Sequence, residues 1–84
     1  MSKYAPLQDR LEREAGDAVT LTFAQIDAIV RLPAAAKRHD FWWSNEDVRT
    51  TVHAQSRAWG AAGFEAEPNI RGKRVTFRRR RDAE

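Results

Sequence analysis

The chain has 84 residues, of which 15 are Lys or Arg and 12 are Asp or Glu, which gives a formal net charge of +3. A chain of this length forms one domain with a modest core, and the absence of Cys excludes disulfide bonds, thiolate metal sites and cysteine nucleophiles. No apolar stretch approaches membrane-spanning length and the N-terminal segment is not hydrophobic, so we expect a cytoplasmic protein.

The first part of the chain predicts two helices that flank a short strand. Apolar residues at helical spacing predict a helix over residues 6–15. Residues 19–23 alternate between apolar and Thr side chains, which is the pattern of a strand. Thr22 followed by Gln25 has the signature of a capping box, which predicts a second helix over residues 23–30.

The middle of the chain predicts two more helices around an aromatic segment. Pro33 suits the first turn of a short helix over residues 34–38. The aromatic triplet at residues 41–43 follows, and we expect one of its two Trp side chains in the core, with the other left open. The Ala-rich residues 53–62 predict a helix that ends at Gly63.

The last part of the chain predicts a β-hairpin. Residues 64–67 and 74–79 form its two strands, and the turn between them contains Pro, Asn and Gly. Val75 and Phe77 alternate with polar side chains, so one face of the second strand enters the core and the other carries cations.

Positive charge is concentrated in the second half of the chain. Residues 1–30 carry a net charge of −2, whereas residues 31–84 carry +5. Seven of the eleven residues from 71 to 81 are Lys or Arg, and none is acidic. A basic region of this kind attracts a nucleic-acid backbone or an acidic protein surface.

The order of elements predicts an α+β fold that is winged-helix-like. A helical cluster would pack on a small three-stranded antiparallel sheet that ends in a C-terminal β-hairpin. We expect a single domain over residues 3–79 and a charged tail over residues 80–84. In such a fold the helix before the hairpin is the recognition helix, and the hairpin lies beside the duplex as a wing.

Three groups of side chains are candidates for nucleic-acid contact. The expected recognition helix offers polar groups for base edges, unless it is an ordinary solvated helix face, and the hairpin offers cations for phosphates. A basic cluster around the short helix would touch the backbone or cover the core with its aliphatic stems. The candidate residues are Lys37, Arg38, Arg49, Thr51, His53, Gln55, Ser56, Arg57, Arg71, Lys73, Arg74, Arg78 and Arg79.

The sequence gives little support for catalysis. Glu46 and Asp47 with His53 suggest acid–base chemistry, but no motif supplies the defined carboxylate geometry of a nuclease. His39 and His53 have no third ligand at a sensible spacing. We therefore expect no enzyme, no metal and no cofactor, and we expect Asn45 to cap the next segment or to fix its loop by hydrogen bonds to the backbone.

Six short motifs follow one another in the chain. They are Lys-Tyr-x-Pro-Leu from residue 3, Leu-Pro-x-x-Ala from 32, Trp-Trp-x-Asn from 42, Ala-Trp from 58, Ala-Gly-Phe from 62 and Val-x-Phe-Arg from 75. In this order they resemble a family of short bacterial domains of unknown function, over residues 3–79. Members often have Gly where this chain has Arg31, and the basic extension at residues 78–81 looks peculiar to this chain. The resemblance implies no activity.

Together these patterns predict a small nucleic-acid-binding module with a regulatory or architectural role, for duplex DNA in preference to single strands. The alternative is a protein-interaction module, antitoxin-like or a phage adaptor, whose basic hairpin docks an acidic partner. A third interpretation is single-strand binding through Trp42 or Trp43. No membrane is expected as a partner.

Overall fold

The computed structural model describes residues 2–80, and it has the expected α+β architecture of a helical cluster on a three-stranded antiparallel sheet. No helix within these residues is long and apolar enough to cross a bilayer. The predicted tail, beyond Arg80, lies outside the described residues. The elements are α1 (Ala5–Glu12), β1 (Ala18–Thr22), α2 (Phe23–Ile29), α3 (Ala34–Arg38), the 3₁₀ helix η1 (Asp40–Trp43), α4 (Ala54–Ala61), β2 (Phe64–Asn69) and β3 (Arg74–Arg79).

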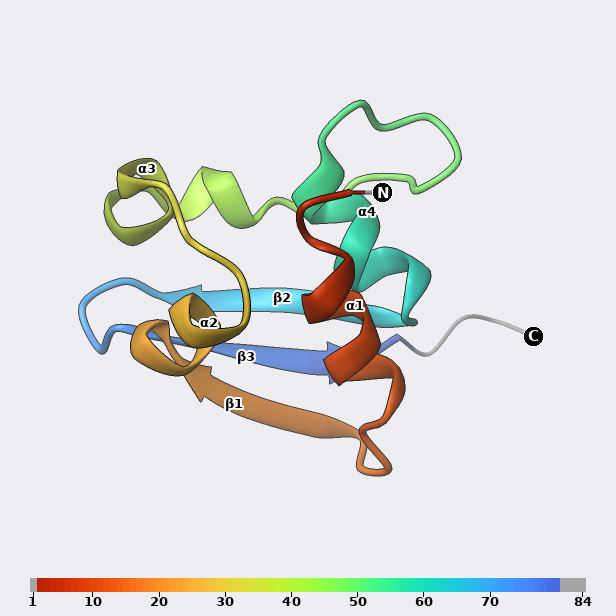
Figure 1. Cartoon of the computed structure of the whole chain (residues 1–84), viewed down its shortest axis with the longest axis horizontal. Helices are drawn as coiled ribbons and strands as arrows, with labels where there is room; N and C mark the ends of the chain where they lie inside the picture. Colours follow the sequence, from red (N-terminus) through yellow and green to blue (C-terminus); the bar gives the residue numbers. More distant parts are fainter. Residues whose placement is uncertain (1, 81–84) are drawn as a thin grey trace.

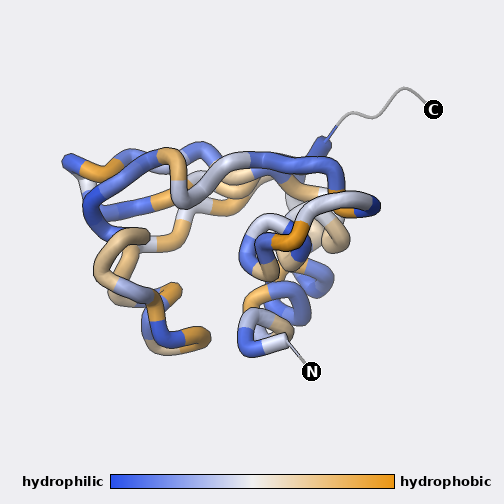
Figure 2. The backbone as a smooth tube through the Cα atoms, turned by 90° about the horizontal axis from the view of Figure 1, so that it is seen from above, coloured by the Kyte–Doolittle hydropathy of each residue, from blue (hydrophilic) through white to orange (hydrophobic). Residues whose placement is uncertain are grey.

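The sheet has the strand order β1-β3-β2, so the last strand in sequence is the central one (Figure 1). Val75 and Phe77 of β3 are fully buried, which confirms that they point into the core. Thr76 faces the other way, and its hydroxyl lies 2.8 Å from that of Thr20 on β1. The helices all lie on one side of the sheet, as the view in Figure 2 shows, and the opposite face is open to solvent.

The core is built around two tryptophans. Trp43 and Trp59 are 0% and 1% exposed, and their rings stack with centroids 5.5 Å apart. Trp59 also contacts Phe77 at 6.0 Å between ring centroids, so α4 packs on the sheet as its Ala-rich face predicts. Trp42 is half-buried and meets Trp43 edge-on at 4.7 Å. The expectation of one core Trp in the triplet is confirmed for Trp43.

Local signals set the start of α2 and the end of α4. The capping box at Thr22 and Gln25 is present, with both reciprocal hydrogen bonds formed. Gly63 follows α4 with a φ of +91°, a conformation that Gly adopts without steric cost. Helix α1 ends at Glu12, before the predicted residue 15. Beyond the helix, the backbone carbonyls of Glu14 and Gly16 accept hydrogen bonds from Arg79 on β3.

The free edge of β2 is covered by Asn45. The Asn45 amide donates to the Ala66 carbonyl at 3.0 Å and accepts from the Ala66 N–H at 2.7 Å, as a neighbouring strand would. The same Asn45 oxygen accepts from the indole N–H of Trp59 at 2.9 Å. Pro68 lies two residues after Ala66, so its backbone nitrogen faces the same outer edge of β2. Its missing N–H therefore removes no hydrogen bond to β3. Asn45 therefore fixes its loop to the backbone, as predicted.

Candidate nucleic-acid interface

The start of α4 is held by the loop that precedes it. The backbone N–H of Glu46 donates to Ser56 at 2.9 Å, and the Glu46 carboxylate accepts from the Thr51 hydroxyl and from Nδ1 of His53. Thr51 and Ser56 are only 6% and 2% exposed. These two residues were expected to contact nucleic acid, and the structure corrects this: their hydroxyls join the loop to the helix and are not accessible.

The remaining polar side chains of α4 are also directed to the protein's own backbone. Gln55 is half-buried, and its Nε2 lies 3.4 Å from the carbonyl of Trp42. Arg57 is exposed, but its guanidinium donates to the carbonyl of Thr51. Helix α4 therefore presents few unengaged polar groups of the kind that a recognition helix uses to read base edges.

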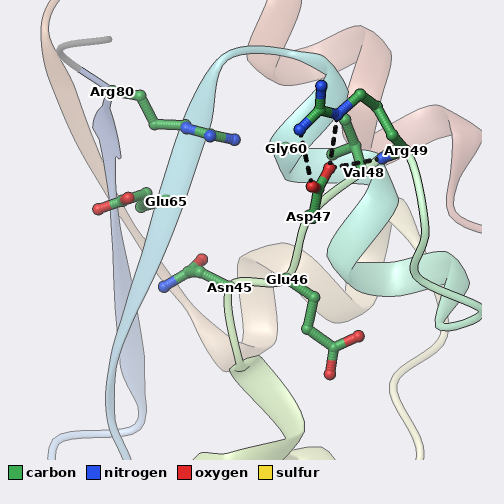
Figure 3. A pocket seen from close by; sticks show the side chains of 8 residues that line it. All are labelled: Asn45, Glu46, Asp47, Val48, Arg49, Gly60, Glu65 and Arg80. Atoms are coloured by element: carbon green, nitrogen blue, oxygen red, sulfur yellow. Dashed lines mark hydrogen bonds and ion pairs between the residues drawn. The ribbon is translucent and has the colours of Figure 1, made fainter. Parts of the chain in front are cut away.

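The same loop carries a charged pair beside a surface hollow (Figure 3). The Arg49 guanidinium donates to both carboxylate oxygens of Asp47, at 3.1 and 3.0 Å. These hydrogen bonds lower the pKa of Asp47 to about 2. Hydrogen bonds from His53 and Thr51 lower the pKa of Glu46. Arg49 is thus exposed but already paired with a carboxylate.

Two cations of β3 are also engaged within the protein. Arg78 lies on the open face of the sheet, as predicted, and pairs with Glu67 of β2 at 3.1 Å. Glu65 is its direct cross-strand neighbour, so this part of the sheet carries both signs of charge. Arg79 lies over the ring of Phe64, 4.6 Å from its centroid, and it donates to backbone carbonyls that follow α1. Arg79 has a structural role that the sequence pattern did not reveal.

The other five candidate cations gather at one end of the molecule. Lys37 of α3 and Lys73 of the hairpin turn line the same hollow, of about 390 Å³, although 36 positions separate them in the sequence. Figure 1 shows α3 and the β2–β3 turn at this end. We call this group the cationic end, and all its side chains are exposed: Lys37, Arg38, Arg71, Lys73 and Arg74.

Few carboxylates neutralise the cationic end. Asp27 is the acidic residue that lines the shared hollow, and it lies 4.0 Å from Lys37. Its carboxylate also accepts the backbone N–H of Leu32 at 2.7 Å, which fixes the connection between α2 and α3. No ion pair joins Arg71, Lys73 or Arg74 to a carboxylate within residues 2–80.

The backbone of the hairpin turn is held in place. The Asn69 side chain accepts the N–H of Gly72 at 2.8 Å, which closes the turn. Lys73 has a φ of +55°, and its carbonyl accepts the N–H of Phe23 at 2.8 Å, at the start of α2. The cations of the turn therefore project from a backbone that is tied to the helical layer.

The described residues contain no group of three or more His, Cys, Asp or Glu side chains that could hold a metal ion. The hydrogen bonds around Glu46 and His53 link a loop to a helix.

A family model for a domain of unknown function, DUF7662, matches residues 4–81, nearly the whole chain. The chain belongs to this family. No curated protein and no solved structure matches the chain significantly. The resemblance to a family of unknown function is confirmed at this level, and the family itself supplies no activity, ligand or partner.

Proposed function

We propose that this domain is a small nucleic-acid-binding module that holds duplex DNA through the phosphates, with the cationic end as its contact surface. One observation carries the proposal: Lys37 and Lys73 line the same hollow. The basic cluster of α3 and the basic hairpin turn therefore lie next to each other. Cations from two separate segments can neutralise several phosphates at once.

The architecture supports a winged-helix-like mode of binding. The element order and the strand order β1-β3-β2 are those of a helical cluster with a wing-like terminal hairpin. In our proposal the wing and α3 contact the backbone, and α4 does not read bases. Binding that rests on phosphates depends weakly on sequence, which favours an architectural role in the cytoplasm over a regulatory one.

The test is to replace Arg71, Lys73 and Arg74 together by Gln and to measure duplex affinity over a series of salt concentrations. Each lost phosphate contact should reduce the slope of log affinity against log salt by about 0.9. Because all three side chains are exposed, the variant should keep the thermal stability of the parent protein.

The matched control replaces Arg10, Arg13 and Arg49 by Gln, which removes the same charge away from the cationic end. Arg10 pairs with Glu14, and Arg49 pairs with Asp47. This variant should bind DNA almost as well as the parent. Equal losses in both variants would mean that net charge alone drives binding. If the parent protein binds no duplex at any salt concentration, an acidic protein partner becomes the better explanation of the hairpin.

A further inference from the structure

Phe41 is a large aromatic side chain that the fold leaves uncovered. It lies in η1 and is 67% exposed, whereas Trp43, two residues later, is fully buried. The Phe41 ring stacks on the ring of His39, with centroids 5.1 Å apart and planes inclined by 20°. Two stacked rings at the surface form a flat face on which a further planar group can stack.

A hollow of about 460 Å³ lies beside this face, with an aromatic side and a polar side. Phe41 and Trp42 supply the aromatic side, and Trp42 is held in place by edge-on contacts with Tyr4 and Trp43. The polar side consists of Ser44, Glu46, His53, Gln55 and Ser56, and each of these side chains already takes part in a hydrogen bond within the protein. A nucleobase is a planar ring system, so its flat face matches the aromatic side of this hollow.

The hollow adjoins the cationic end along the chain. Arg38 ends α3 only three residues before Phe41, and Lys37 precedes it by four. Four residues of chain span at most about 15 Å, which is roughly the rise of four nucleotides along one strand. A strand whose phosphates lie on α3 can therefore deliver a nearby base to Phe41.

We infer that Phe41 and the hollow beside it receive an unpaired nucleobase, so that the preferred ligand is duplex DNA with a single-stranded extension. This inference rests on the proposed function, because the phosphates of the same molecule occupy the cationic end. Phe41 takes the stacking role in place of Trp43. The Trp43 ring is fully buried, and its indole N–H donates to the carbonyl of Ala36.

The experiment compares the affinity of the protein for a blunt duplex and for the same duplex with a four-nucleotide extension that carries 2-aminopurine. The extension should raise the affinity about tenfold, in line with the stacking of one base on an aromatic side chain, and the 2-aminopurine fluorescence should fall on binding. Phe41→Ala and Phe41→Leu should abolish both effects and leave the affinity for the blunt duplex unchanged. Phe41→Trp should retain them.

Val52→Ala is the matched control. Val52 is 87% exposed and does not line the hollow, so this variant removes exposed apolar surface without touching the stacking face. It should behave as the parent protein. All variants are first compared by thermal unfolding, and Phe41→Leu retains an apolar side chain of similar bulk but has no aromatic face.

Two results would overturn the inference and leave the proposed function intact: an extension that gives no gain in affinity, or Phe41 variants that keep the gain. A loss of affinity in Phe41→Leu that is equal for blunt and extended duplexes would also overturn it. If the parent protein binds neither DNA at low salt, the proposed function fails and this inference fails with it.

Discussion

Replacing Asn45 by Ala tests whether one side chain joins the loop, α4 and the edge of the sheet. Asn45 makes three hydrogen bonds, to the N–H and the carbonyl of Ala66 and to the indole of Trp59. These groups belong to two elements, β2 and α4, so the Asn45 side chain joins both of them to its loop.

The stability lost in Asn45→Ala depends on whether water can reach each hydrogen-bonding partner that the side chain leaves behind. The two Ala66 groups face the outer edge of β2, where water can replace the amide, so their loss costs about 0.5 kcal/mol each. Trp59 is 1% exposed, and its indole N–H is left without an acceptor, which costs about 1–3 kcal/mol. We therefore expect a total loss of about 2–4 kcal/mol, a large fraction of the 5–15 kcal/mol that is typical of a folded domain.

Urea unfolding followed by Trp fluorescence and by circular dichroism measures this loss. Asn45→Asp retains an acceptor for Trp59 but cannot donate to Ala66, so its stability should lie between those of the Ala variant and the parent. Ser44→Ala is the control, because its exposed hydroxyl makes one local hydrogen bond to the carbonyl of Phe41. If the free energy of unfolding of Asn45→Ala lies within about 0.5 kcal/mol of that of the parent, water satisfies all three groups and our reasoning fails.

Three further predictions concern stability. Trp59→Ala should cost about 3–5 kcal/mol and abolish cooperative thermal unfolding; a near-parental melting curve would contradict the packing. Gly60→Ala should destabilise α4 by about 1–3 kcal/mol despite the better helix propensity of Ala, because the added Cβ would lie 2.3 Å from Cγ1 of Val48. Adding Val48→Ala should restore stability, and a Gly60→Ala protein more stable than the parent would refute the contact. Asp47 has a pKa of about 2 when folded against an ordinary value of 3.8, so its stabilising effect is complete above pH 3.8 and is lost as the pH falls towards 2. Thermal unfolding of Asp47→Asn should therefore depend less on pH in this range than that of the parent, and parallel curves would show that the pair with Arg49 is not formed.

The sequence predicted the elements whose signals are local. The alternation around Val75 and Phe77 gave the inward face of β3, and the capping box at Thr22 gave the start of α2. Burial of Trp59 followed from its position on the Ala-rich face of α4. In each of these cases the residues that decide the structure lie within a few positions of one another.

The roles of the polar side chains could not be predicted, because their partners are distant in the sequence or lie in a loop without a repeating pattern. Thr51 and Ser56 are residue types that often contact nucleic acid. In the structure both are buried, and both are hydrogen-bonded to Glu46 of the preceding loop. Arg79 belongs to a basic run, yet its partners follow α1, more than 60 positions earlier. A charge pattern reveals which side chains are cationic, but not which of them the fold has already used.

The position of β3 has a consequence for how the domain forms during synthesis. Strands β1 and β2 do not pair with each other, and each is hydrogen-bonded only to β3 among the described strands. A nascent chain that has been translated only as far as residue 73 therefore has two isolated strands and no sheet, and its core lacks Val75 and Phe77. Because an isolated strand is not stable in water, we expect the sheet to form only after β3 has been synthesised.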